Sequence, residues 1–254
     1  MNLHYQTIGA GQPLVILHGL FGSSDNWRGI ATELSAYAQV ITVDLRNHGQ
    51  SPHSSEQTYA LMAEDLAELF DRLQLDKVSI IGHSMGGKVA MAFSQYYPQW
   101  LDKLIVVDIA PRQYFDEHSA IFKSLLALDL DLYSSRNDVD NALRSTLPNK
   151  AVRQFLLMNL SLNREQLSWR INLQALYDNY VHFLEAVCED ETVMLPSCFI
   201  RGGQSAYIRD EDEDLIRAAF PYSELVTIQQ AGHWVHAEAP QQFLTQITEF
   251  LDYD

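Results

Sequence analysis

The sequence has few cysteines: its 254 residues include only Cys188 and Cys198. The spacing of this pair fits neither a zinc knuckle nor a Cys-x-x-Cys redox motif. Disulfides are rare in the cytoplasm, where thiols are kept reduced. We therefore expect two reduced thiols and predict a cytoplasmic protein.

Basic residues are also scarce. Lys and Arg number 17 against 33 Asp and Glu, so the formal net charge is −16 at pH 7. A field of this sign repels phosphate backbones and anionic lipids, which argues against nucleic-acid binding. A run of about 18 apolar residues is missing, so we predict no membrane span. The first residues, MNLHY, lack the basic and apolar regions of a secretory signal, and none is expected.

Hydrophobic residues, in contrast, make up 47% of the chain, enough to bury one core or a core with a lid. Short apolar runs alternate with segments whose apolar residues recur at helical spacing. Continuous apolar strands suit a parallel sheet covered on both faces, so the pattern predicts one α/β domain. The expected strands are residues 14–17, 40–43, 78–81, 104–107, 198–200 and 225–228, and the expected helices include 62–73, 86–97 and 243–251.

One segment interrupts this alternation. Residues 112–195 show only helical patterns, between the strand at 104–107 and the strand at 198–200. We predict a helical lid, or cap, of residues 112–195 inserted over the carboxyl ends of the strands, where open α/β sheets place their active sites. Residues 1–111 and 196–254 would then form the core domain. Ordinary helices packed against the sheet are the alternative.

The stretch that points to chemistry is residues 78–87, VSIIGHSMGG, an apolar strand followed by Gly-x-Ser-x-Gly and then a helix. This order is typical of a nucleophile elbow, in which a turn too tight for neighbouring Cβ atoms exposes a strained serine at a helix N-terminus. The helix dipole and free N–H groups there favour developing negative charge. We predict Ser84 as the nucleophile; a plain turn is the alternative.

The general base is expected after the last predicted strand, in the sequence AGHW around His233. This loop should lie on the same sheet edge as the elbow, and neutral imidazole can accept a hydroxyl proton near pH 7. His18 is more plausible as a shaper of the oxyanion loop, His83 flanks the nucleophile, and His236 is the nearest rival. His233 and His236 have no obvious third ligand, so we predict no metal, and no cofactor is expected.

Four motifs make the chain similar to the α/β-hydrolase superfamily: residues 18–22 (HGLFG), 44–51 (DLRNHGQS), 82–87 (GHSMGG) and 232–240 (GHWVHAEAP). Within it, the chain most closely resembles the bacterial YbfF-type esterases, which are related to mitochondrial ABHD-type hydrolases. The motifs of that subgroup are residues 108–111 (DIAP), 169–173 (WRINL) and 202–207 (GGQSAY). The resemblance implies the α/β-hydrolase fold, with a mostly parallel sheet and an inserted helical lid, and a serine hydrolase.

The oxyanion hole should use the backbone N–H of Met85, the residue after the nucleophile, and one N–H from the loop after Gly19. The resemblance implies Leu20 as the second donor. Phe21 is the alternative donor, and its ring is also a candidate wall of the acyl pocket. Simple packing of the loop is the remaining interpretation.

Trp234 is the other residue predicted to bind substrate, because it follows His233 directly. Further aromatic candidates, each of which could equally belong to the core, are Trp27, Phe122, Trp169 and Tyr207. Lys88 and Arg170 could meet an acidic acyl group or a phosphate, with a surface role as the alternative.

The acid of the triad is less obvious. Many relatives place Asp after the strand that here is residues 198–200, but the following loop, GGQSAY, has no carboxylate. Asp210 comes later, in the acidic run 210–214, which reads as a solvated helix start. Asp108 ends the preceding strand, where it could orient His233, and the resemblance implies the same residue. We predict Asp108; a turn cap before Pro111 is the alternative.

The predicted function is a serine carboxylesterase that hydrolyses small to medium acyl esters or thioesters, acyl-CoA among them, through an acyl-Ser84 intermediate. The many leucines and aromatic residues of the lid suit an apolar pocket. Other serine-dependent chemistries on this fold stay open, namely carbon–carbon hydrolysis, haloperoxidase-like reactions and a lyase reaction. A non-catalytic receptor or scaffold is a further alternative. We expect a monomer or small homo-oligomer whose partner is a small-molecule substrate.

Overall fold

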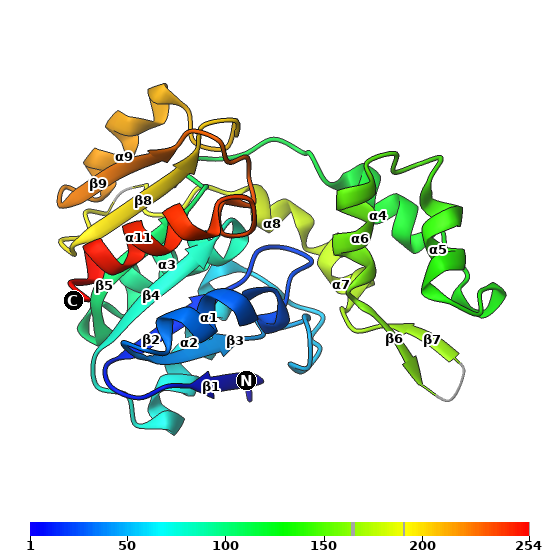
Figure 1. The fold of residues 1–254 in the computed structure, drawn as a ribbon, viewed down its shortest axis with the longest axis horizontal. Coiled ribbons are helices and arrows are strands. Elements are labelled where there is room, and N and C mark those ends of the chain that lie inside the picture. The colour runs from blue at the N-terminus through cyan, green and yellow to red at the C-terminus, as the bar shows by residue number, and fades with distance from the viewer. Residues whose placement is uncertain (164–165, 190, 254) are drawn as a thin grey trace.

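A computed structural model describes residues 1–163, 166–189 and 191–253. Its centre is a seven-stranded sheet in the order β1-β3-β2-β4-β5-β8-β9 (Figure 1). Only β1 runs antiparallel to its neighbour, and the other pairs are parallel. The strands are β1 (Tyr5–Ile8), β2 (Pro13–Leu17), β3 (Gln39–Val43), β4 (Val78–His83), β5 (Leu101–Val107), β8 (Ser197–Gly202) and β9 (Ser223–Ile228).

Helices cover both faces of the sheet because successive side chains of each strand point to opposite sides. Val15 and Leu17 belong to one buried cluster, whereas Leu14 and Ile16 belong to another. The first cluster contains α2 (Tyr59–Leu73), α3 (Met85–Tyr96) and α9 (Glu213–Ala219), and the second contains α1 (Arg28–Leu34) and α11 (Pro240–Leu251). The remaining short elements of the core are η1 (Ser24–Trp27), η2 (Pro98–Trp100), η4 (Asp210–Asp212) and α10 (Val235–Glu238). The predicted α/β class is confirmed.

The edge strand β1 was not expected from the sequence. Its residues, YQTI, are partly to fully exposed, and they lack the apolar runs of the five inner strands. Backbone pairing with β3, from Tyr5 opposite Val43 to Ile8 opposite Val40, holds it in place. Such pairing leaves no mark on side-chain periodicity at a solvated edge.

The segment between β5 and β8 forms a helical insert, which Figure 1 shows as a group of elements beside the sheet. Its helices are α4 (Ser119–Leu126), η3 (Leu130–Leu132), α5 (Arg136–Leu143), α6 (Lys150–Leu157), α7 (Leu173–Asp178) and α8 (Tyr180–Leu184). The expectation of helices only is wrong, because β6 (Leu160–Asn163) and β7 (Gln166–Trp169) form an antiparallel hairpin. Alternating leucine and polar residues give this stretch a period of two. The boundaries at 112 and 195 stay a prediction.

The acidic run at 210–214 does begin a helix, as expected, but it is not wholly solvated. Asp212 is buried, and its carboxylate lies 2.9 Å from the guanidinium Nε of Arg112. Its other oxygen accepts a hydrogen bond from the Arg209 backbone N–H at 2.8 Å. The sequence pattern could not distinguish this carboxylate from its exposed neighbours.

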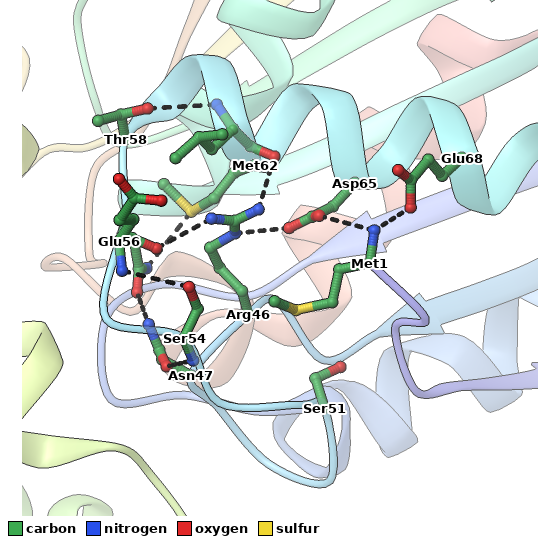
Figure 2. A network of polar contacts seen from close by, with 12 residues as sticks. Met1, Arg46, Asn47, Ser51, Ser54, Glu56, Thr58, Met62, Asp65 and Glu68 are labelled. Atoms are coloured by element: carbon green, nitrogen blue, oxygen red, sulfur yellow. Dashed lines mark hydrogen bonds and ion pairs between the residues drawn. The ribbon is translucent and has the colours of Figure 1, made fainter.

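A polar network fixes the loop that follows β3 against α2 (Figure 2). The guanidinium of Arg46 lies 2.6 Å from Asp65 and also donates to the carbonyl of Glu56. The neighbouring Asn47 is tied to the insert, since its carbonyl accepts from the Asn172 N–H at 2.9 Å. This hydrogen bond connects the loop after β3 to the insert. Within the described residues, no helix has the length and apolar character needed to cross a membrane.

Candidate active site

Ser84 occupies a sharp turn between β4 and α3, with φ of 53° and ψ of −119°. Its flanking glycines are sterically required: a Cβ on Gly82 would lie 2.3 Å from the Gly86 carbonyl oxygen, and one on Gly86 would lie 2.6 Å from that of His18. The Ser84 N–H donates to the Val107 carbonyl at 2.9 Å, whereas its side chain makes no capping hydrogen bond to α3. The backbone is fixed while the hydroxyl remains available for chemistry.

His233 and Asp108 form a hydrogen-bonded pair, with 2.7 Å between His233 Nδ1 and Asp108 Oδ2. Asp108 ends β5, is fully buried and has φ of 51°. Its Oδ1 accepts from the Gly202 N–H at 3.0 Å, and its Oδ2 also accepts from the Ser205 hydroxyl. Because a carboxylate only accepts, Nδ1 of His233 carries the proton and Nε2 is left as the basic nitrogen.

Two rings hold the His233 imidazole in place. The Tyr207 ring is stacked on it, with centroids 3.9 Å apart and planes inclined by 19°. His83 Nε2 lies 2.9 Å from the His233 carbonyl oxygen and donates its proton to it. Burial, reinforced by the neighbouring histidines, holds the pKa of His83 well below the ordinary value, so this ring is neutral. His83 therefore supports the His233 loop.

The segment after β2 forms a tight turn beside Ser84. The Gly22 N–H donates to the Gly19 carbonyl at 2.9 Å, which leaves Leu20 and Phe21 as the central residues. A Cβ on Gly19 would lie 3.3 Å from the Ser84 Cβ, so the turn passes directly by the elbow. Phe21 has φ of 61°, a left-handed conformation that costs a non-glycine residue roughly 1–2 kcal/mol.

The His18 ring connects this turn to the loop after β3. Its Nδ1 lies 2.8 Å from the Gly19 carbonyl, and its Nε2 accepts from the Leu45 N–H at 3.0 Å. Complete burial lowers the pKa of His18 and so keeps the ring neutral. Because Nε2 accepts from Leu45, the ring proton lies on Nδ1. On the other side of Ser84, Met85 is the first residue of α3, and N–H groups in the first turn of a helix have no intrahelical acceptor.

Ser84 and His233 line a common, mostly apolar cavity of about 200 Å³. Of the other residues predicted for the site, Leu20, Phe21, Trp27, Tyr207 and Trp234 line the same cavity. The insert supplies His118, Ile121, Val152, Phe155 and Leu156. A second cavity of about 40 Å³ also reaches Ser84, and Met85 contributes to its lining. The predicted site residues from distant parts of the chain therefore converge on one place.

Two other aromatic candidates belong to hydrophobic packing. The buried Phe122 ring packs against that of Phe21, with 4.8 Å between the ring centroids. Trp169 is half-buried against the larger hydrophobic cluster.

His236 is a buried residue that also lines the cavity. Its ring is stacked on Trp27 at 4.1 Å, and burial lowers its pKa to about 3. The His236 ring is therefore neutral and, together with Trp27, forms part of the cavity lining. Among the residues that the structure describes, no cluster of His, Cys, Asp or Glu has the arrangement of a metal site.

Neither cation considered as a ligand for acidic groups is free for that role. Lys88 is completely buried, and its Nζ donates to the carbonyl of Arg112, which precedes α4, and to that of Glu185, which follows α8. Arg170 pairs with Asp25 at 3.2 Å and so connects the insert to the core. Both residues join the two parts of the molecule, which their sequence neighbours could not indicate.

Lys88 should make the stability of the protein depend on pH in the alkaline range. Burial lowers the pKa of its ammonium from 10.5 to about 7. Between these values the unfolded chain binds the additional proton, so stability rises with pH by up to about 1.4 kcal/mol per unit. We expect the free energy of unfolding of the parent, relative to that of Lys88→Met, to rise between pH 7 and pH 10, as measured by urea denaturation at each pH. A constant difference between the two proteins over that range would contradict it.

Sequence reasoning missed Ser205, whose hydroxyl donates to Asp108. The signal in the sequence is its position in GGQSAY, the loop after β8 that carries no carboxylate. Its partner comes from the neighbouring strand β5, and only the strand order shows that β5 and β8 are adjacent.

Known proteins are similar to this chain in both fold and sequence. A family described as alpha/beta hydrolase fold matches residues 12–240. Esterase YbfF of Escherichia coli is 38% identical over 243 residues, covering 94% of this chain and 93% of that protein. The sn-1-specific diacylglycerol lipase ABHD11 of Danio rerio is 38% identical over 262 residues, covering 99% and 83%. A solved structure of a marine microorganism esterase superposes with a TM-score of 0.95 at 41% identity, over 98% of each chain.

Proposed function

The chain belongs to the α/β-hydrolase family and is a serine hydrolase that acts on esters, and we propose that it works through an acyl intermediate on Ser84. The observation that carries this proposal is the Asp108–His233 hydrogen bond of 2.7 Å beside a cavity that His233 shares with Ser84. This pair leaves His233 Nε2 as a base for a serine hydroxyl that is not used in capping.

In the first half of the proposed reaction, the Ser84 hydroxyl oxygen attacks the ester carbonyl carbon while His233 Nε2 takes its proton. The N–H groups of Met85 and Leu20 would stabilise the oxyanion. When the bond to the alcohol breaks, His233 returns the proton to the leaving oxygen. In the second half, His233 takes a proton from water, whose oxygen attacks the acyl-Ser84 carbonyl carbon. The bond from that carbon to the Ser84 oxygen then breaks, His233 returns the proton to the serine oxygen, and the carboxylic acid leaves. Asp108 holds the imidazole in the required tautomer throughout.

The cavities favour small to medium acyl groups. Their volumes of about 200 and 40 Å³ are below the roughly 300–1,000 Å³ of pockets that enclose drug-sized ligands. Thioesters of the same acyl groups would pass through the same acyl-enzyme and are proposed as further substrates. The test is a panel of p-nitrophenyl esters of graded acyl length and the matching acyl-CoA thioesters. A maximum of kcat/KM at short to medium chains is expected, and equal rates at every length would contradict the proposal.

Phe155 is expected to limit acyl length from the side of the insert. It lines the main cavity, and its ring lies 5.6 Å from that of Trp234. Phe155→Ala should raise kcat/KM for long relative to short esters by about tenfold, because each additional buried methylene is worth about 0.8 kcal/mol. The control is Leu132→Ala, at an insert residue that is 75% exposed. A ratio that changes equally in both variants would count against a role for Phe155.

We also propose a cytoplasmic location, in which the free and buried Cys188 and Cys198 would stay reduced. All the residues proposed for catalysis come from a single chain. A monomer is therefore sufficient for the reaction, and a small homo-oligomer is equally compatible with it.

A further inference from the structure

Asn159 connects the insert to the turn that carries the proposed oxyanion donor. It lies between α6 and β6, and only 4% of its surface is exposed. Its side-chain amide donates to the Phe21 carbonyl at 2.8 Å and to the Leu156 carbonyl at 3.1 Å. Its own carbonyl accepts from the Arg170 N–H at 2.8 Å, which ties it to the hairpin. The asparagine is thus fixed on one side and reaches the core on the other.

The group that Asn159 holds is conformationally strained. Phe21 is the second of the two central residues of the turn and has φ of 61°. If Phe21 relaxed to a negative φ, one of the two peptide units beside it would have to rotate, which would either turn the Phe21 N–H away or break the hydrogen bond from the Gly22 N–H that closes the turn. The amide of Asn159 opposes this relaxation at the Phe21 carbonyl, and the ring of Phe122 in α4 opposes it at the Phe21 side chain. Both contacts come from the insert.

We propose that Asn159 is a positioning residue that keeps the turn of residues 19–22 in its oxyanion-binding conformation, so that the insert completes the oxyanion hole. This inference rests on the proposed function, because it requires an oxyanion formed at Ser84. Asn159 itself touches neither the substrate nor the reacting atoms. Its contribution is to keep a backbone N–H directed at the place where negative charge develops.

The chain offers a matched control in Asn179, at the end of α7. Its side-chain amide also donates to one carbonyl of the core, that of Ser55 at 2.8 Å, and to one carbonyl of its own helix, that of Ala175 at 2.8 Å. It therefore has the same kind of contact between insert and core, but at the loop after β3. Loss of either amide removes one donation to the core and one to the insert, and at Asn179 it also removes the hydrogen bond that Oδ1 accepts from the Gln57 N–H at 3.2 Å.

The experiment compares Asn159→Ala and Asn179→Ala in the full-length protein with a short p-nitrophenyl ester. We expect Asn159→Ala to lower kcat by about 10–100-fold with little change in KM, because misplacing an oxyanion donor by an ångström is enough for such a loss. Asn179→Ala should keep kcat within about twofold of the parent. Asn159→Asp, which keeps the shape without the donor, should lose as much as Asn159→Ala and decides the matter if the alanine variant does not fold.

A second readout separates oxyanion binding from general loss of structure. A trifluoromethyl ketone accepts the Ser84 oxygen at its carbonyl carbon, its own oxygen becomes the oxyanion, and the serine proton moves to His233. In the Asn159 variants its Ki should rise by the same factor by which kcat falls, whereas the Ki of an unreactive alcohol should stay unchanged. This split requires a defect at the oxyanion, which a merely destabilised insert would not produce.

Equal loss of kcat in the Asn159 and Asn179 variants, or no loss in either, would overturn the proposal. An equal rise in Ki for the ketone and the alcohol would also overturn it. These results are distinguishable from a failure of the proposed function, which appears as full activity in Ser84→Ala. If Ser84 is essential and Asn159 behaves like its control, only the role of Asn159 is wrong.

Discussion

Replacing Ser84 with alanine is expected to reduce ester hydrolysis by about 10⁴–10⁶-fold, the usual loss on removing a triad nucleophile. The residual rate should come only from substrate binding and the oxyanion donors. The fold should persist, because alanine removes one oxygen that caps no helix. The measurement is kcat/KM for a p-nitrophenyl ester, together with thermal unfolding of the same preparation.

Ser94→Ala is the matched control for Ser84→Ala. Ser94 also lies in α3, but it is buried and its hydroxyl donates to the Met91 carbonyl at 2.6 Å. Its replacement should leave kcat within about twofold of the parent. Activity in Ser84→Ala close to that of the parent would remove Ser84 from the mechanism.

Asp108→Asn is expected to lower kcat by about 10⁴-fold, because the substitution inverts the tautomer of His233. One oxygen of Asp108 accepts from Gly202, and the other accepts from both Ser205 and His233. Asparagine has only one such oxygen. If its oxygen keeps the Gly202 contact, its amide N–H₂ faces His233 Nδ1, which must then accept, and the ring proton moves to Nε2. A protonated Nε2 cannot take the proton of Ser84.

Asp210→Asn is the control for this substitution and a test of the alternative acid. The Asp210 side chain is 92% exposed and pairs with Arg201 at 2.7 Å, outside the two cavities that reach Ser84. Its loss should change kcat by no more than about twofold. A large loss in Asp210→Asn combined with a small one in Asp108→Asn would move the acid to the loop after β8.

The parts of this molecule that could be predicted are those whose requirements are local in sequence. The elbow at 82–87 needs glycines flanking a serine between a strand and a helix, and all of these are visible in ten consecutive residues. The inner strands each contain an apolar run because both their faces are buried. Chain order then places His233 on the same sheet edge as Ser84.

Other features depend on pairings between distant segments, and no local pattern could show them. The environments of Lys88 and Asn159 were not predictable, because the carbonyls of Arg112 and Phe21, to which they donate, lie 24 and 138 residues away. Asp108 is intermediate: the end of a strand identified a candidate carboxylate, but its three donors come from two loops beyond the insert. The hairpin β6–β7 was missed because each of its four-residue strands shows the period of two over only two repeats, between segments with helical spacing.

The central claim, that Ser84 carries the acyl group, is tested most directly by locating a fluorophosphonate adduct by mass spectrometry. The reagent reacts with a serine activated as proposed here, in which His233 accepts the hydroxyl proton and the oxyanion donors hold the phosphonyl oxygen. We expect one adduct per chain, on the peptide that contains Ser84, and loss of hydrolytic activity in proportion to labelling. An enzyme that stays active without labelling at Ser84, or that is inactivated by labelling at another residue, would contradict the account.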